Sequence, residues 1–236
     1  GRVKQGQRDA AGAIEKGRRQ VSEDAGTLSE NYSGTVRAGK VSFNNVPAFI
    51  YRRDVEVETP GFGKITGDIV FGGAFYYYIN AAQAGLTVKP ELVRQLIQLG
   101  AETKAAVMAK VAIAHPLEPG LNTLYGTIID SEPNFPGADQ SNVCIFADRE
   151  VDRSPTGTGT SGRAAQLFLR GQLALGQHYV NGSIVGSNFG VRVTAATKVG
   201  DFDGALTEVS GYAHIMSTNQ WVLEESDPFP TGFFLR

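Results

Sequence analysis

A glycine-rich segment in the second half of the chain holds the residues best suited to chemistry. It reads Asp152-Arg153-Ser154-Pro155-Thr156-Gly157-Thr158-Gly159-Thr160-Ser161-Gly162, and a helix is predicted after it, from about Arg163 to Leu175. Such a loop presents unpaired backbone N–H groups at the start of a helix, where the helix dipole also favours negative charge. Because glycine has no Cβ, Gly157 and Gly159 let the backbone approach a ligand closely. The segment is therefore suited to a small anion, either a carboxylate or a phosphate.

Two phosphate-binding patterns fit this segment poorly. A P-loop ends in Gly-Lys-Ser or Gly-Lys-Thr, whereas this chain has Gly162-Arg163-Ala164 at the matching place. The dinucleotide spacing G-x-G-x-x-G is present, but the Asp-Arg-Ser-Pro lead-in is unlike a strand that runs straight into the turn. On these residues alone, a structural glycine-rich turn stays as open an interpretation as a carboxylate or phosphate site.

The remaining reactive residue types point to structural roles. Cys144 is the only cysteine, which excludes an intrachain disulfide and fits a reducing compartment. Its neighbours Val143 and Ile145 are apolar, so we expect a buried structural thiol. The three histidines lack the spacing of metal ligands, and we expect neither a metal site nor a cofactor at His115, His178 and His214.

Composition limits the class of partner. The 236 residues are 42% hydrophobic and 19% charged, with a formal net charge of -2. Mixed charges of this kind give no basic face for nucleic acid. No apolar stretch reaches the roughly 18 residues of a membrane-spanning helix. We therefore expect a cytoplasmic protein that binds neither nucleic acid nor a membrane, whereas the glycine-rich segment indicates a small-molecule ligand.

Short strands must position the glycine-rich segment. Runs rich in Val, Ile, Phe and Tyr, separated by Gly and Pro, are typical of strands. They predict strands over Val41–Tyr51, Val55–Glu58, Lys64–Phe71, Ala74–Ile79, Thr123–Ile129, Asn142–Ala147, Ser183–Ala196, Ala205–Ser210 and Tyr212–Ser217, with a last piece near Trp221–Leu223.

A long helix is predicted between these strands. Apolar residues recur at three- and four-residue spacing from Leu92 to Val111, and this stripe is expected to pack under the sheet. Pro90 suits the first turn, and Pro116 falls just beyond the end. The predicted fold class is α/β (α+β), with a mixed sheet wrapped around this long central helix and a second, shorter one. Residues 1–26 are polar and are predicted to be a disordered or frayed leader.

The glycine-rich segment resembles the second active-site motif of the proline racemase family. That motif reads Asp-Arg-Ser-Pro-Cys-Gly-x-Gly-x, and this chain differs in having Thr156 at the place of the cysteine. Asn45–Phe49, Asp68–Tyr76 and Val209–Gly211 resemble the family too. The resemblance covers residues 27–236 and implies a diaminopimelate epimerase-like lobe, the second of two pseudo-symmetric lobes. The last residues, about 15 of them, are then expected to return toward the first lobe.

The threonine changes the chemistry that this resemblance implies. Family members with cysteine at both positions exchange a proton between the two faces of proline or hydroxyproline. Thiols are suited to this step, because their pKa of about 8.5 can be tuned toward neutrality. A threonine hydroxyl stays protonated, so Thr156 cannot be the second base. The resemblance is to the threonine-containing branch, a cofactor-independent hydro-lyase that dehydrates trans-3-hydroxy-L-proline to pyrroline-2-carboxylate.

The same resemblance assigns roles to individual residues. Thr156 is the catalytic residue and hydrogen-bonds the departing hydroxyl, while Asp152 accepts from the ring ammonium. The N–H groups of Gly157 and Thr158 hold the carboxylate, and Phe146 forms an apolar wall over the ring. The alternatives are a turn cap for Asp152, a surface hydroxyl for Thr156 and a plain core side chain for Phe146.

Other functions stay open beside this one. The family's other half-site, Met-Cys-Gly-His with the general-base cysteine, does not occur in the sequence. We therefore expect a truncated enzyme that is inactive as this chain alone, with an apolar face prone to self-association and a homodimer as one assembly. The alternatives are a proline racemase or hydroxyproline epimerase, and a non-catalytic remnant that only binds a ligand.

Overall fold

The structure is a computed structural model, and it describes residues 40–213, 217, 219–230, 232 and 233. The predicted leader 1–26 and His214 lie outside these residues. The fold is a mixed sheet with helices, of the α+β class. The strands are β1 (Lys40–Asn44), β2 (Ala48–Thr59), β3 (Gly63–Phe71), β4 (Phe75–Asn80), β5 (Leu124–Ser131), β6 (Gln140–Phe146), β7 (Glu150–Val151), β8 (Tyr179–Ser183), β9 (Asn188–Val199) and β10 (Phe202–Tyr212). The helices are α2 (Val93–Lys110) and α3 (Gly157–Leu169), with 3-10 turns at Ala81–Ala84, Pro90–Leu92 and Pro119–Leu121.

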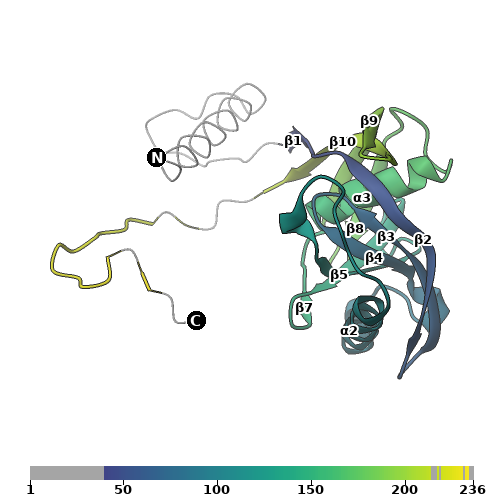
Figure 1. Cartoon of the computed structure of the whole chain (residues 1–236), viewed down its shortest axis with the longest axis horizontal. Coiled ribbons are helices and arrows are strands. Elements are labelled where there is room, and N and C mark those ends of the chain that lie inside the picture. The colour runs from purple at the N-terminus through teal and green to yellow at the C-terminus, as the bar shows by residue number, and fades with distance from the viewer. Residues whose placement is uncertain (1–39, 214–216, 218, 231, 234–236) are drawn as a thin grey trace.

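The sheet closes on itself. Within the described residues ten strands pair in the order β1-β10-β2-β3-β4-β5-β6-β8-β9, with β7 attached to β6. Because β9 also pairs with β10, the strands from β10 through β2 and on to β9 form a closed ring (Figure 1). The pairs β4–β5 and β6–β8 are parallel, and the remaining pairs are antiparallel.

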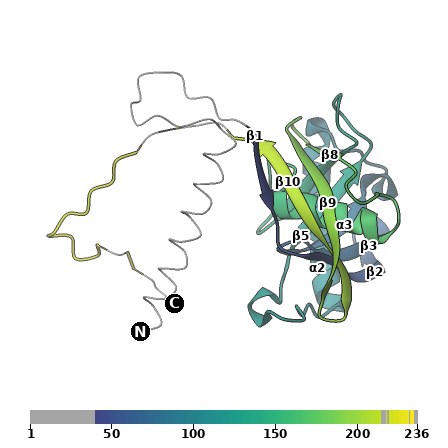
Figure 2. The same cartoon turned by 90° about the horizontal axis from the view of Figure 1, so that it is seen from above.

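The helix inside this ring is α3 and not the long helix that the sequence predicts to be central. α3 contacts β2, β3, β9 and β10 and lies behind β9 and β10 in Figure 2. The longer α2 packs on the outer face, against β2, β5 and β6. Its predicted apolar stripe is confirmed, since Leu96, Leu99 and Val107 are buried there. Hydrophobic periodicity reveals that a helix has one buried face, but it does not reveal which side of a closed sheet that face meets.

Alternation along β4 separates the two faces. Phe75, Tyr77 and Ile79 belong to the core beneath α2, whereas Tyr76 and Tyr78 point to the interior of the ring. Side chains of a strand alternate between its faces, so the run of three tyrosines serves both sides of the sheet. The outer core is rich in large aromatic and aliphatic side chains, and the inner one is built around Ala164 and Ala165 of α3.

Small residues let α3 fit within the ring. A Cβ added at Gly159 would lie 2.3 Å from Cδ1 of Ile128, and one added at Gly162 would lie 2.3 Å from the hydroxyl of Tyr78. Both glycines are therefore required by close packing, because real Cβ atoms do not approach other atoms so closely. This corrects the expectation that Gly159 lets a ligand approach the backbone.

Buried ion pairs fix the far end of α3. Arg170 donates to both carboxylate oxygens of Asp68 at 2.6 and 2.8 Å, and Gln166 donates to the same group at 2.7 Å. Burial alone would raise the pKa of Asp68, but these hydrogen bonds from Arg170 and Gln166 bring it below its usual value of 3.8. One turn before Gln166, Arg163 pairs with the buried Asp130 at 3.3 Å. The stripe Arg163, Gln166 and Arg170 thus binds the helix to β3 and β5.

Several predicted boundaries differ from the structure. The strand predicted over Val41–Tyr51 is two strands, β1 and β2, which are separated by residues 45–47 and both pair with β10. The strand predicted over Ser183–Ala196 is likewise divided by a turn between β8 and β9. α3 starts at Gly157 and ends at Leu169, earlier at both ends than the predicted helix. Around Trp221–Leu223 there is no strand, and these three side chains are exposed.

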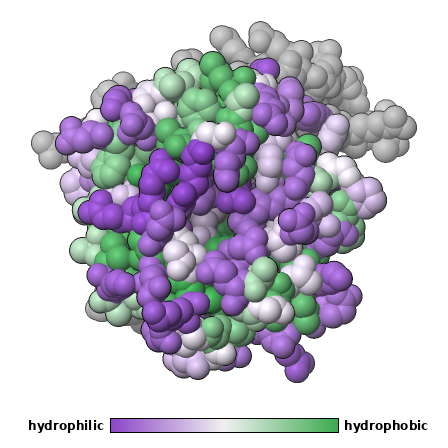
Figure 3. Space-filling view, turned by 90° about the vertical axis from the view of Figure 1, so that its right-hand side faces the viewer, coloured by the Kyte–Doolittle hydropathy of each residue, from purple (hydrophilic) through white to green (hydrophobic). Residues whose placement is uncertain are grey.

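One face of the molecule carries few large apolar areas. Figure 3 shows this face, where hydrophilic residues cover much of the surface and apolar ones form separate patches. Within the described part of the chain, no helix combines the length and the apolar character that crossing a membrane requires.

The Asp68–Arg170 pair should carry a large share of the stability. Asp68→Asn removes one partner of a buried pair, so we expect the free energy of unfolding to fall by about 3 kcal/mol in urea denaturation. Because the folded pKa of Asp68 lies below its usual value, its contribution is complete at neutral pH and is lost as the pH falls through that folded pKa. The acid-induced loss of stability should therefore be smaller in the variant than in the parent.

A matched control is Asp203→Asn, because Asp203 pairs with Lys198 at 2.7 Å on the exposed surface. This control should leave the free energy of unfolding nearly unchanged. Equal losses in the two variants would contradict the role of Asp68.

Candidate active site

The glycine-rich segment lies at the start of α3, at one end of the strand ring. Asp152 follows β7, and the chain enters α3 through Pro155 and Thr156. Its residues from Gly157 onward form the first turns of the helix and not the loop that the sequence predicts. The helix N-terminus, with its positive dipole end, therefore begins directly at the predicted catalytic residue.

Asp152, Ser154 and Thr156 form one hydrogen-bonded cluster. Oδ2 of Asp152 accepts from the Thr156 hydroxyl at 2.9 Å and from the Ser154 hydroxyl at 3.0 Å. Oδ1 of Asp152 accepts from the backbone N–H of Ser154 at 2.8 Å. Three of the roughly four acceptor positions of a carboxylate are thus in use, and one remains for a ligand. The two residues on which the sequence hypothesis depends lie within hydrogen-bond distance of each other.

Thr156 has an unusual backbone conformation. Its φ is 65° and its ψ is 112°, in the positive-φ half of the Ramachandran plot where β-branched residues are rare. Such a conformation costs on the order of 1–3 kcal/mol and persists only where the surroundings hold it. The Thr156 side chain is buried, and its hydroxyl hydrogen is engaged by Asp152, so that its lone pairs are what a ligand can use.

The first N–H groups of α3 are free to bind an anion. Among residues 40–213, the backbone N–H groups of Gly157 and Thr158 have no hydrogen-bond acceptor. A Cβ added at Gly157 would meet only Cζ of Phe43, at 4.0 Å, so the space beside this glycine is open. Gly157 thereby differs from Gly159 and Gly162, which face the packed interior. An accessible pair of N–H donors at a helix N-terminus is suited to a carboxylate.

Aromatic side chains line the approach to Thr158. The Tyr76 hydroxyl and the Thr158 hydroxyl are 2.8 Å apart, and either oxygen can be the donor. Tyr125 packs against Tyr76 with ring centroids 5.5 Å apart, and Phe146 stacks on Tyr125 at 5.4 Å. Phe146 is therefore connected to the start of α3 through two tyrosines. Burial raises the pKa of Tyr76 well above its usual range, so the phenol stays neutral and keeps its hydrogen.

Two features of this site are absent from the residues that the sequence predicts for it. Tyr76 is the first, although its place on the inner face of β4 follows from strand alternation. The Gly72-Gly73 turn packs against Thr158, since a Cβ added at Gly72 would lie 2.3 Å from the Thr158 carbonyl oxygen. Asn45 donates to the Gly72 carbonyl at 2.7 Å and fixes that turn. Two consecutive glycines between strands were the available signal for a close backbone approach.

Cys144 lies behind Thr156 and is sealed from solvent. Its side chain is 0% exposed, which confirms the predicted buried thiol. Burial raises its pKa to about 12. A thiol of this kind stays protonated near neutrality, so Cys144 does not act as a base.

The described histidines belong to other environments. His115 packs against the rings of Phe49 and Phe71, and burial lowers its pKa. His178 is exposed beside β8. Over the described ranges, no three His, Cys, Asp or Glu side chains gather closely enough to hold a metal ion.

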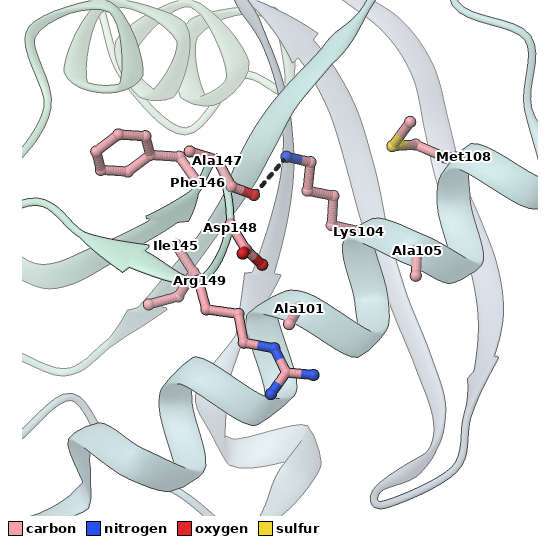
Figure 4. Close-up of a pocket in the computed structure, with 9 residues that line it drawn as sticks. All are labelled: Ala101, Lys104, Ala105, Met108, Ile145, Phe146, Ala147, Asp148 and Arg149. Carbon is pink, nitrogen blue, oxygen red and sulfur yellow. Dashed lines mark hydrogen bonds between the residues drawn. The ribbon is translucent and has the colours of Figure 1, made fainter.

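A separate cavity opens on the outer face, between α2 and the turn that joins β6 to β7. Its volume is about 270 Å³, and it is lined by Ala101, Lys104, Ala105, Met108, Ile145, Phe146, Ala147, Asp148 and Arg149. Figure 4 shows Lys104 donating to the Ala147 carbonyl, at 3.3 Å, while the Phe146 ring points away from this lysine. The cavity and the Thr156 cluster are therefore on different faces of the sheet.

The geometry suits a small zwitterion. The α3 N-terminus offers two N–H donors for an anionic group, and Asp152 offers one free acceptor position for a cationic group. Thr156 lies between these groups and supplies a neutral hydroxyl. An amino or imino acid carries both charges at the spacing of one carbon atom.

Comparison with known proteins agrees with this chemistry. Residues 11–234 match the family model described as "Proline racemase". The trans-3-hydroxy-L-proline dehydratase of Burkholderia ambifaria is 54% identical over 199 residues, which are 84% of this chain and 59% of that relative. The 3-hydroxyproline 2-epimerase of Burkholderia multivorans is 52% identical over 84% of this chain and 59% of its own length. The chain thus spans about 59% of the length of these curated relatives.

A solved structure has a similar fold. The hydroxyproline epimerase from Agrobacterium vitis, with bound trans-4-hydroxy-L-proline, superposes with a TM-score of 0.75 at 26% sequence identity. The superposition covers 92% of this chain and 67% of the epimerase chain.

Ser154 should stabilise the cluster at the start of α3. Its hydroxyl donates to Asp152 and accepts from the Thr156 N–H, both at 3.0 Å. Ser154→Ala removes both contacts, so we expect the free energy of unfolding to fall by about 2 kcal/mol in urea denaturation. Ser226→Ala is the control, because the Ser226 hydroxyl donates only to the exposed Glu224. An unchanged stability in Ser154→Ala would show that the cluster contributes nothing to folding.

The Cys144 thiol should be inert in the folded protein. Its raised pKa and complete burial leave neither thiolate nor access for a reagent. A colorimetric thiol reagent at pH 8 should therefore react only after denaturation, and it should then titrate one thiol per chain. Fast reaction of the native protein would refute the burial of Cys144 behind Thr156.

Proposed function

Because the chain belongs to the proline racemase family, we propose that it forms part of the active site of a hydro-lyase acting on trans-3-hydroxy-L-proline. The reaction removes the α-proton and the 3-hydroxyl group, which together make one water, and yields pyrroline-2-carboxylate. The observation that carries this proposal is the 2.9 Å hydrogen bond between Thr156 and Asp152 at an open helix N-terminus. A hydroxyl there supports elimination, because it cannot ionise to exchange a proton on the second face.

The substrate carboxylate is bound by α3 in this proposal. The N–H groups of Gly157 and Thr158 have no acceptor within residues 40–213, and the space beside Gly157 is open. Removing the α-proton places additional negative charge on the same carboxylate as an enolate-like state forms. Fixed N–H donors and the helix dipole stabilise that charge more than they stabilise the substrate, which is how they lower the barrier.

Asp152 receives the ring ammonium. Its carboxylate is held by Ser154 and Thr156 and keeps one acceptor position, so no rearrangement is needed before the substrate binds. A charge-assisted hydrogen bond of this kind contributes about 1.5–3 kcal/mol. With the carboxylate on α3 and the ammonium on Asp152, the ring has a single orientation.

Thr156 acts at the 3-hydroxyl group. Its own hydroxyl is donated to Asp152 and its lone pairs remain, so it can accept a hydrogen bond from the substrate hydroxyl and orient it for departure. The buried Cys144, with a pKa of about 12, is not suited to take the α-proton. The general base is therefore a group outside this cluster. We propose that this chain alone binds the substrate without turnover.

Phe146 and its neighbours form the apolar wall in this proposal. Phe146 stacks on Tyr125, and Tyr125 packs on Tyr76 beside Thr158. These rings would exclude water from one side of the substrate and so strengthen its polar contacts.

Finer features of the assembly are also part of the proposal. The strand ring would be one of two pseudo-symmetric lobes of a diaminopimelate epimerase-like fold, in a cytoplasmic protein. Phe43 and Val46 are about half exposed, at 47% and 49%; Phe43 lies beside the open side of Gly157, and Val46 lies beside Gly73. Apolar side chains in this place support burial against another lobe or a second copy. Analytical ultracentrifugation would test the homodimer.

A two-base epimerase is the alternative, since one relative at 52% identity is named a 3-hydroxyproline 2-epimerase. Thr156 argues against it, because a hydroxyl does not take up and return a proton as a thiol does. Thr156→Cys, made in a protein that supplies the general base, should gain inversion at the α-carbon, because a thiol can return a proton to the opposite face. Inversion already present with Thr156 would favour the epimerase.

Binding of pyrrole-2-carboxylate tests the proposal directly. This planar acid mimics the deprotonated substrate, so the chain should bind it measurably in isothermal titration calorimetry. Asp152→Ala should weaken the binding of trans-3-hydroxy-L-proline more than about tenfold, because an unscreened ammonium contact is lost. Asp203→Ala, at an exposed surface pair, is the control. If the chain bound neither compound, the proposed function would be wrong.

A further inference from the structure

We propose that Asn142 is a positioning residue that holds Thr156 in its left-handed conformation by way of the Pro155 carbonyl. The side-chain amide of Asn142 donates to that carbonyl oxygen at 3.0 Å. Asn142 is 2% exposed and lies on β6, 13 residues before the proline whose carbonyl it contacts. The geometric claim stands on the structure alone, and its consequence for substrate binding rests on the proposed function.

Asn142 is a rigid support. Its backbone is paired on both sides, with Asp130 of β5 and with Ser183 of β8. A side chain in the middle of a sheet has little freedom to move with the loop that it contacts. The orientation of its amide is also fixed, because only the nitrogen can donate to a carbonyl oxygen.

A second donor reaches the same carbonyl from α3. The Thr160 hydroxyl donates to the Pro155 oxygen at 3.1 Å, and it accepts from the amide of Asn181 at 2.9 Å. Asn181 is buried on β8. The Pro155 carbonyl is therefore held from the sheet by Asn142 and from the helix by Thr160.

The peptide between Pro155 and Thr156 is fixed at both of its polar atoms. Its carbonyl accepts from Asn142 and Thr160, and its N–H donates to Ser154 at 3.0 Å. A peptide group is planar, so fixing both atoms fixes the plane. The proline ring sets the φ angle just before it. The φ angle of Thr156 is 65°. The hydrogen bonds of the preceding peptide group and the bond from the Thr156 hydroxyl to Asp152 hold it there.

Asn142 and Asn181 each lower the stability of the fold through one unpaired side-chain oxygen. Oδ1 of Asn142 and Oδ1 of Asn181 are buried without a hydrogen-bond partner among the described residues. A buried acceptor without a donor destabilises the folded state, and each such group needs a reason. Holding the Pro155 carbonyl supplies that reason for Asn142, because its amide nitrogen makes the contact while its oxygen stays unpaired. This pattern is expected of a residue that serves the site more than the fold.

The test compares crystal structures of the unaltered chain, Asn142→Leu and the double variant Asn142→Leu/Thr160→Val. Leucine and valine keep the volume and remove both donors to Pro155. We expect Thr156 to leave positive φ in the double variant and its hydroxyl to lose contact with Asp152. The thermal midpoint of Asn142→Leu should stay the same or rise, because the unpaired Oδ1 is removed with the amide.

Thr160→Val alone is the milder variant, and it tests the same carbonyl if the leucine variants do not fold. We expect a partial displacement of the Pro155–Thr156 peptide in its crystal structure. Ser161→Ala is the matched control. Ser161 lies in the same helix as Thr160, and it makes a buried hydrogen bond with Thr207 of β10 instead of with Pro155. It should lower the thermal midpoint and leave Thr156 unchanged.

Calorimetry with pyrrole-2-carboxylate gives the second readout. Misplacing the first N–H groups of α3 should weaken this probe by roughly tenfold to a hundredfold in the double variant, with no change in Ser161→Ala. If Thr156 kept its φ and its contact with Asp152 in the double variant, the positioning role would be overturned whatever the probe did. If the unaltered chain bound no probe while Thr156 moved as expected, the proposed function would fail and the positioning role would stand.

Discussion

Confinement of a helix inside a closed sheet governs the rest of this structure. The ring of strands leaves room for α3 only because Gly159 and Gly162 present no side chain to Ile128 and Tyr78. Once the helix is enclosed, its polar groups must find partners within the ring, since buried polar groups without partners are costly. Arg170 and Gln166 meet Asp68 at one end, and the other end opens toward Gly157. Packing of the helix inside the ring thus determines that its positive dipole end is accessible to a ligand at Gly157.

Stability and chemistry are located at opposite ends of the same helix. The carboxyl end is fixed by a buried, doubly hydrogen-bonded ion pair between Arg170 and Asp68. The amino end keeps unpaired N–H groups, a β-branched residue at positive φ and a carboxylate with a free acceptor position. Features of the second kind reduce stability and are found where binding or catalysis uses them. Because the Arg170–Asp68 pair holds the carboxyl end of α3, the N–H groups at its amino end can remain unpaired without loss of the fold.

The sequence indicated contacts within the glycine-rich segment better than the arrangement of elements around it. The nine-residue motif from Asp152 to Thr160 indicated that Thr156 and Asp152 act together, and they are hydrogen-bonded. The stripe from Leu92 to Val111 correctly predicted a helix with a buried face. The sequence could not show that the shorter helix is the enclosed one, because Arg163, Gln166 and Arg170 have the composition of a solvent-exposed stripe. Only the buried acids opposite them, far away in the chain, give these side chains partners.

Strand β10 has a consequence for how the protein is made. It pairs with β9, with β1 and with β2, so it completes the ring, and it comes after the other strands of the described residues. During synthesis the enclosure around α3 therefore cannot be finished until Phe202–Tyr212 have left the ribosome. Contacts between segments so far apart in sequence slow folding, because loop-closure entropy is lost before they form. Until then the inner faces of the earlier strands are open to pairing with other chains.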